Sequence, residues 1–325
     1  MRIKLSALVV VLLLVGCSPR SMSAHQATPT PVATLTPVTT PAPVATPTHQ
    51  ATLTPVATLT QVVLKFSGQA ALAHVEAQMK LGARPTGSEA GRKTGDYILA
   101  QLRQSGWTTE EQRFDYKGTG IRNIIGRKGS GPALIIGAHY DTRRRADRDK
   151  TRPGDPVPGA NDGASGVAVL LELARVLDAK KLGNQVWLAF FDAEDNGGLD
   201  GWEWIVGSRY MAQNLTVKPT VVVVVDMIGD ADQQIYFDQN SNSDWSQRIW
   251  SAAAELGYGQ YFIPKAKYAM FDDHTAFAQQ GIPAVDIIDF DYPYWHTTAD
   301  TADKLSPESL ERVGRTLQLV LEQSR

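Results

Sequence analysis

Cysteine is almost absent from this sequence. The chain of 325 residues contains one cysteine, Cys17. A single cysteine has no partner in its own chain, so internal disulfide bonds are excluded. Any argument for export must come from another feature of the sequence.

The sequence also lacks an excess of charge of either sign. Lysine and arginine together number 32, aspartate and glutamate 34, and the net charge is −2. No stripe of Lys and Arg is present that could follow a phosphate backbone, so we do not expect a nucleic acid partner. After residue 15, no apolar stretch is long enough to cross a bilayer.

The first 17 residues follow the plan of a secretory signal. Arg2 and Lys4 precede an apolar run over residues 5–15, which is too short to span a bilayer as a mature helix. The run ends in LVGC (14–17), which resembles the bacterial lipobox, in which the cysteine is lipidated. We therefore expect a lipoprotein signal peptide at 1–17, lipidation at Cys17 and a protein anchored at the outer face of a bacterial cell membrane. The alternative is an ordinary signal peptide.

Residues 18–61 differ from the rest of the chain in composition. They consist mainly of Thr, Pro, Ala and Val, with no Lys, Arg, Asp or Glu after Arg20. The strings HQAT (25–28) and PVATLT (31–36) return at 49–52 and 55–60. Frequent proline removes backbone donors and favours extended conformations, so we expect a disordered stalk.

Residues 62–325 suit one large α/β domain. Helical patterns cover residues 70–81, 89–105, 166–177, 245–256 and 307–323. Strand patterns cover residues 107–116, 121–126, 133–137, 186–191, 221–225 and 284–288. Three of these strands are continuous β-branched or aromatic runs, which is typical of strands buried on both faces. We predict a three-layer α/β/α sandwich with a mixed, mostly parallel central sheet.

Acids or histidines follow each predicted buried strand. In an open α/β sheet the carboxyl ends of parallel strands form the ligand crevice, and charge placed there is unfavourable unless it is paired or bound to metal. Asp162 is a further acid, in a segment rich in glycine. Its simpler interpretation is the N-cap of the helix that follows, rather than a metal ligand. The residues that follow the strands are His139, Asp141, Asp192, Glu194, Asp195, Asp226, Asp289 and Asp291, with His296 shortly after.

Six short motifs occur in an order that resembles the zinc aminopeptidase and glutaminyl cyclase family. They are GAHYD (137–141), NDGASG (161–166), FDAED (191–195), DMIG (226–229), DH (273–274) and WHT (295–297). The resemblance covers nearly all of the chain after residue 61. It implies the three-layer fold of the zinc aminopeptidases, which is phosphorylase/hydrolase-like, and a zinc-dependent enzyme that acts on the N-termini of peptides.

The resemblance also implies metal ligands. Asp162, Asp195 and His296 match one zinc position, and His139 and Asp226 match the additional ligands of a second position that shares Asp162. Position 195 is Asp where many family members carry Glu. Imidazole and carboxylate are the expected ligands of a catalytic zinc. Glu194 matches the residue that transfers protons.

Two chemistries remain open at this stage. A glutaminyl cyclase would use one zinc and convert an N-terminal Gln to pyroglutamate with loss of ammonia, whereas an aminopeptidase would use two zinc ions and hydrolyse the first peptide bond. Asp272 favours the cyclase, because an acid at that position in cyclases groups with the residues that match Glu194 and Asp226. Trp295 matches a cyclase pocket residue, and Trp202 and Trp204 are candidates for another pocket wall.

Other residues receive simpler interpretations. Arg143, Arg144 and Arg145 with Asp147 and Asp149 are predicted to form a solvated loop of mixed charge. His274 is predicted to be a structural histidine. A non-catalytic surface module on the same fold is a further alternative, and we expect a monomer.

Overall fold

The computed structural model describes residues 64–324. The predicted signal peptide, Cys17 and the predicted stalk over residues 18–61 lie outside the described residues. Within residues 64–324, no helix combines the length and the apolar character that a membrane crossing requires.

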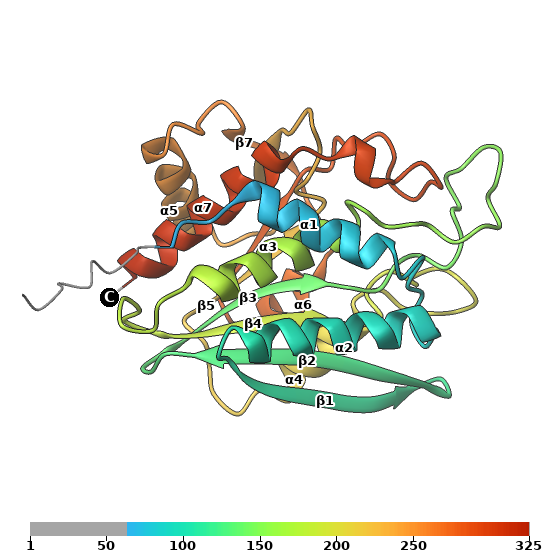
Figure 1. Ribbon diagram of the computed structural model, residues 1–325, viewed down its shortest axis with the longest axis horizontal. Coiled ribbons are helices and arrows are strands. Elements are labelled where there is room, and N and C mark those ends of the chain that lie inside the picture. The colour runs from blue at the N-terminus through green and yellow to red at the C-terminus, as the bar shows by residue number, and fades with distance from the viewer. Residues whose placement is uncertain (1–63, 325) are drawn as a thin grey trace, which may run out of the picture. The chain divides into compact units, whose positions relative to one another are not determined.

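A six-stranded sheet lies at the centre of the domain (Figure 1). β3 pairs in parallel with β4 and with β5, and β5 pairs in parallel with β8. The antiparallel pairs β1–β2 and β2–β4 complete one side. The mixed, mostly parallel sheet is therefore as predicted. In spatial order the strands are β1 (Thr108–Tyr116), β2 (Thr119–Lys128), β4 (Gln185–Phe191), β3 (Ala133–His139), β5 (Val221–Asp226) and β8 (Ala284–Ile288).

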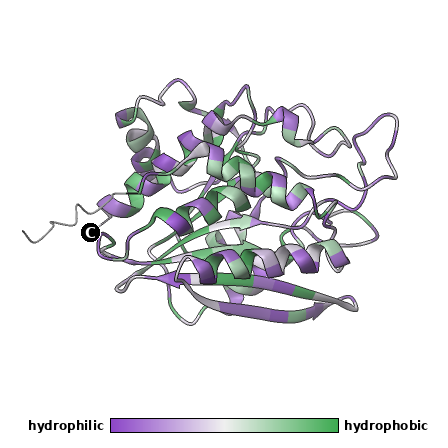
Figure 2. Ribbon diagram, viewed as in Figure 1, coloured by the Kyte–Doolittle hydropathy of each residue, from purple (hydrophilic) through white to green (hydrophobic). Residues whose placement is uncertain are grey.

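The central strands are buried on both faces. Val221, Val223 and Val225 of β5 pack into one apolar core, while Val222 and Val224 pack into the other. This alternation follows from the two-residue period of a strand. In Figure 2 the central strands are green and the edge strand β1 is largely purple, which agrees with a sheet whose interior strands are covered by helices.

Helices cover both faces of the sheet, which confirms the predicted three layers. On one face, α2 (Glu89–Gln104) and α3 (Ala164–Val176) pack against the sheet, and α1 (Gly68–Met79) and α7 (Pro307–Gln323) pack on α3. The helix α5 (Ser243–Glu255) packs against α7. The other face is covered by α4 (Val206–Gln213) and α6 (Asp273–Ala278), which pack against each other.

The shorter elements were not predicted from the sequence. They are α4, most of α6, the 3-10 turn η1 (Ala302–Lys304) and the parallel pair β6 (Ile235–Asp238) and β7 (Phe262–Tyr268). These elements are short, and β7 is mostly exposed, so their hydrophobic patterns are too brief to be distinguished from loops.

The start of α3 brings a loop close to the strand ends. Gly163 directly precedes the helix with a φ of 101°, a conformation that favours glycine. A Cβ at Gly166 would lie 2.5 Å from the carbonyl oxygen of Val225, so only glycine allows α3 to approach β5 this closely. Asp162 is thereby placed beside the ends of the central strands.

Candidate active site and metal centre

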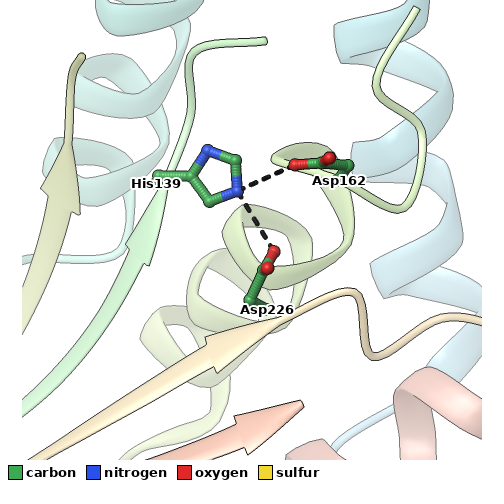
Figure 3. Close-up of side chains that lie close together, drawn as sticks. All are labelled: His139, Asp162 and Asp226. Atoms are coloured by element: carbon green, nitrogen blue, oxygen red, sulfur yellow. Dashed lines mark hydrogen bonds and ion pairs between the residues drawn. The ribbon is translucent and has the colours of Figure 1, made fainter. Parts of the chain in front are cut away.

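Two groups of buried ligand atoms share the carboxylate of Asp162. Its Oδ1 lies 3.2 Å from His139 Nε2, and its Oδ2 lies 3.7 Å from His296 Nε2. His139 Nε2 is also 3.1 Å from Asp226 Oδ1, and Figure 3 shows these three side chains converging. His296 Nε2 is 3.1 Å from Asp195 Oδ1. The two groups are His139–Asp162–Asp226 and Asp162–Asp195–His296.

The fold explains why these residues meet. His139 ends β3 and Asp226 ends β5, and the two strands are parallel neighbours. Their carboxyl ends therefore lie at the same edge of the sheet. Asp300 holds the loop before α3, because its carboxylate accepts the backbone N–H groups of Asn161 (2.8 Å) and Asp162 (3.2 Å).

The loop after β4 carries Glu194 and Asp195. Asp141 organises this loop, because its carboxylate accepts the backbone N–H of Glu194 at 3.0 Å and that of Asp195 at 3.2 Å. His296 comes from the loop between β8 and η1. The structure thus brings all five residues predicted as metal ligands into one site.

Three residues at this site have left-handed backbones. Ala193, Met227 and His296 have φ values of 62°, 46° and 58°. Such conformations cost non-glycine residues about 1–3 kcal/mol each and are concentrated at functional sites. Here they turn the chain sharply next to Glu194, next to Asp226 and at His296 itself.

The donor atoms fit a zinc ion. Within the described residues, His139 Nδ1, Asp162 Oδ2 and Asp195 Oδ2 are buried polar atoms that lack a hydrogen-bond partner. Leaving buried polar atoms unpaired is unfavourable, and a cation bound by Asp162 and Asp195 would satisfy the two carboxylate oxygens. Imidazole nitrogens and carboxylate oxygens are ligands of catalytic zinc.

Carboxyl groups crowd beside these ligands. Burial raises the pKa of Glu194 well above its ordinary value, and the charge of Asp195 adds to the rise. Burial also raises the pKa of Asp226 to about 7 and raises the pKa of Asp272. Neighbouring carboxylates that cannot all ionise share protons, which suits a group that must take up a proton and return it.

A cavity of about 200 Å³ opens onto this group. The predicted residues Trp204 and Trp295 line it, and Asp272 lies in its wall. The tryptophan at position 202 does not line this cavity. Trp202 packs instead with Ile121, Ala193 and Val206. The full lining is Asp162, Glu194, Asp195, Trp204, Asp226, Met227, Met270, Phe271, Asp272, Ile288, Phe290, Trp295 and His296.

Not every acid that follows a strand belongs to the site. Asp289 accepts the backbone N–H groups of Gln234 and Asp291, and Asp291 pairs with Lys267. Asp192 accepts the backbone N–H of Arg122. These three acids have structural partners and do not line the cavity.

The loop of mixed charge is wrongly predicted in part. Arg143 is 3% exposed and pairs with Asp147 and with Asp195, a candidate ligand. Asp147 lies 3.3 Å from His296 Nδ1. Sequence reasoning missed this pair, although the position of Arg143 two residues after Asp141 at a strand end was an available signal. His274 is fully buried, and its Nε2 lies 3.3 Å from Asp238 Oδ2.

Sequence reasoning also missed the apolar rim of the cavity. Met270, Phe271 and Phe290 come from loops that carry no motif. Phe271 is 51% exposed, which is unusual for an aromatic side chain.

Comparisons with known proteins agree with the fold. A glutaminyl cyclase from Porphyromonas gingivalis is 34% identical with a TM-score of 0.76, and the match covers 80% of this chain and 99% of that one. A Zn-dependent exopeptidase from Parabacteroides distasonis is 32% identical with a TM-score of 0.75 and the same coverage. A glutaminyl-peptide cyclotransferase from Drosophila melanogaster is 27% identical over 264 residues, 69% of this chain and 72% of that protein.

A family model described as Peptidase family M28 matches residues 123–321, which include every candidate metal ligand and Asp272. The match spans more than half of the chain, and each of the two solved structures just described matches 80% of it. The protein belongs to peptidase family M28.

Proposed function

We propose that this protein is a zinc-dependent glutaminyl-peptide cyclotransferase, which converts the N-terminal Gln of peptides to pyroglutamate and releases ammonia. One observation carries the proposal. Asp272 lines the same cavity as Glu194 and Asp226, and burial raises the pKa of all three carboxyl groups. A group of acids that share protons matches a reaction in which a proton moves from one nitrogen to another.

Asp162, Asp195 and His296 would hold the zinc. When bound, zinc supplies Lewis-acid polarisation of a carbonyl oxygen. In the cyclisation, the α-amino nitrogen forms a bond to the carbonyl carbon of the Gln side chain (Cδ), and the bond from that carbon to the side-chain nitrogen (Nε2) breaks. Glu194 takes a proton from the α-amine and gives it to the departing nitrogen, which leaves as ammonia. Asp226 and Asp272 share protons with Glu194, and this sharing lets Glu194 both accept and release a proton.

The size and lining of the cavity support a small substrate group. A cavity of about 200 Å³ lies below the usual range for larger ligands and suits one amino acid side chain. Trp204, Phe290 and Trp295 in its wall would keep water away from the reacting carbonyl. Exclusion of water favours attack by the substrate's own amine over hydrolysis.

A two-zinc aminopeptidase is the second candidate function. The observation that favours it is the position of Asp162, whose two carboxylate oxygens face two different histidines as a bridging ligand would. His139 and Asp226 complete the second group. In that reaction Glu194 would take a proton from the attacking water and give it to the leaving amine.

The product identifies the reaction. Zinc-loaded protein is incubated with a Gln-initiated peptide, and the product is analysed by mass spectrometry. Loss of ammonia without shortening of the peptide supports the cyclase, whereas release of free Gln supports the aminopeptidase. A protein that binds zinc and forms neither product would be a non-catalytic module.

We further propose that the mature protein is anchored to a membrane by a lipid on Cys17. The support is the sequence pattern alone, an apolar run that ends in glycine and the sole cysteine of the chain.

A further inference from the structure

Arg143 and Asp147 form a partly buried ion pair beside the active site. Arg143 Nε donates to Asp147 Oδ1 at 2.8 Å, and Nη2 donates to Asp147 Oδ2 at 2.7 Å. The arginine side chain is 4% exposed, and the Asp147 side chain is 40% exposed. Two parallel hydrogen bonds fix the plane of the guanidinium relative to the carboxylate.

The pair contacts both terminal ligands of one candidate metal position. Arg143 Nη1 lies 3.3 Å from Asp195 Oδ1 and also donates to the backbone carbonyl oxygen of Asp195 at 3.2 Å. Asp147 Oδ1 lies 3.3 Å from His296 Nδ1, the ring nitrogen opposite the one that faces Asp162 and Asp195. One ion pair therefore holds a carboxylate and an imidazole that come from distant parts of the chain.

The pair also reaches the wall of the cavity. The guanidinium carbon of Arg143 lies 4.7 Å from the ring centroid of Trp204. Trp204 is nearly parallel to the His296 ring, with centroids 6.0 Å apart and an interplanar angle of 10°. Arg143, Trp204 and His296 thus restrict one another's orientation.

Among residues 64–324, the other candidate position has only longer contacts of this kind, from His139 Nδ1 to Asp141 at 3.7 Å and to Glu194 at 4.0 Å. Within the described residues, Asp226 forms an ion pair with His139 and with no other residue. His139 Nδ1 lacks a hydrogen-bond partner in this part of the chain, and its nearest carboxylate oxygen, on Asp141, is 3.7 Å away. Groups that hydrogen-bond to a metal ligand on its side away from the metal typically contribute a factor of about 10–100 to metal affinity.

We propose that Arg143 and Asp147 are positioning residues that make the Asp162–Asp195–His296 position bind zinc more tightly than the His139–Asp162–Asp226 position. The proposal rests on the proposed zinc dependence of the enzyme. Because the pair has no net charge, it contributes orientation rather than added attraction for the cation.

The variant Arg143→Gln separates orientation from charge. Removing a positive charge 3.3 Å from a ligand carboxylate would, by Coulomb attraction alone, strengthen cation binding. The proposal predicts the opposite, a zinc dissociation constant raised about 10–100-fold, measured by competition with a chromogenic chelator. Tighter or unchanged zinc binding in this variant would overturn the proposal.

Asp147→Ala provides a second variant, and its partial exposure favours correct folding. This variant should raise the dissociation constant of the same zinc by a similar factor. Arg145 and Asp200 form the matched control pair, because they pair at 2.7 Å with both side chains exposed. Arg145→Gln and Asp200→Ala make the same charge changes and should leave the dissociation constant within about twofold, as expected for exposed pairs.

A second pair of variants identifies the tighter position. His139→Ala should keep one tightly bound zinc, and His296→Ala should lose it, as counted by elemental analysis. The reverse pattern would contradict the proposal. These measurements report zinc and not product, so they can fail while the cyclase assay succeeds, and the assay can fail while they succeed.

Discussion

The indole ring of Trp295 lies against the imidazole ring of His296, with centroids 3.9 Å apart and planes inclined by 33°. Trp295 lines the cavity, and His296 is a candidate zinc ligand. The left-handed backbone at His296 turns the chain so that these neighbours face the same space. A substrate that packs on Trp295 is therefore held next to the metal position.

Replacing Trp295 should weaken substrate binding. Trp295→Leu removes an aromatic wall of the cavity, and we expect KM for a Gln-initiated peptide to rise about tenfold, which corresponds to about 1.4 kcal/mol. Zinc content should stay unchanged, because His296 still contacts Asp147 and Asp195. Trp202→Leu is the control, since Trp202 packs outside the cavity, and its KM should match the wild type. Equal KM values for all three proteins would remove Trp295 from the substrate site.

Replacing Glu194 should stop the chemistry without releasing the metal. Glu194→Gln keeps the shape of the side chain but cannot accept the proton, so we expect kcat to fall about 10²–10⁴-fold. Zinc content, measured by elemental analysis, should equal that of the wild type. A variant that turns over at the wild-type rate would exclude Glu194 as the proton carrier.

Asp272 offers a test in which the helix is preserved. Asp272 is the N-cap of α6, and asparagine is an equally good N-cap, so Asp272→Asn should keep α6 folded. The variant loses the carboxyl that shares protons with Glu194, and we expect pyroglutamate formation to fall at least about 10²-fold. Full cyclase activity in a folded Asp272→Asn protein would remove the observation on which the cyclase proposal depends.

Much of the fold could be predicted from the sequence, because long elements carry periodic patterns. The runs that became β3, β4 and β5 are continuous and apolar, and their ends carry the histidine and acids that meet at the sheet edge. The candidate metal ligands followed from the resemblance carried by the ordered motifs. For this reason Asp162 could be proposed as a ligand although a simple N-cap was the alternative.

The remaining features depend on the geometry of loops, whose sequences carry no periodic hydrophobic pattern. Nothing local in the sequence separates Trp202, which packs in a small core, from Trp204, which lines the cavity. Arg143 looks like its neighbours Arg144 and Arg145 but is buried against Asp195, a residue 52 positions away. Contacts at such separations are set by how the strands pair, and the one local signal is the position of Arg143 two residues after Asp141 at a strand end.

The pH dependence of stability provides a test that does not require bound metal. Asp286 of β8 is fully buried, and burial raises its pKa well above the ordinary value of 3.8. The folded protein therefore holds this proton at pH values where the unfolded chain has lost it, so the free energy of unfolding falls as pH rises above about 4. The charges that add to the rise are those of Asp272, Asp238, Asp226 and Asp273.

Asp286→Asn removes the carboxyl group that binds this proton, so the folded and unfolded proteins no longer differ in its protonation. We expect the stability of the variant relative to the wild type to increase between about pH 5 and about pH 8, as measured by urea unfolding of metal-free proteins. Metal-free proteins are used so that pH-dependent zinc binding does not contribute to the measured difference in stability. A stability difference that is constant with pH would show that Asp286 ionises normally in the folded protein.

The proposed lipid anchor is tested by Cys17→Ser. Serine cannot be lipidated in this way, so the variant should move from the membrane fraction to the soluble fraction when the full chain is expressed in a bacterial host. Immunoblots of both fractions give the measurement. Identical partitioning of the variant and the wild type would contradict lipidation at Cys17.

The central claim is tested most directly by counting tightly bound zinc while following one Gln-initiated and one Leu-initiated peptide with the same protein sample. The account predicts one tightly bound zinc per chain, a pyroglutamyl peptide of unchanged length from the first substrate and no reaction with the second. Two tightly bound zinc ions together with free leucine from the second peptide would contradict it and assign the protein to the aminopeptidases.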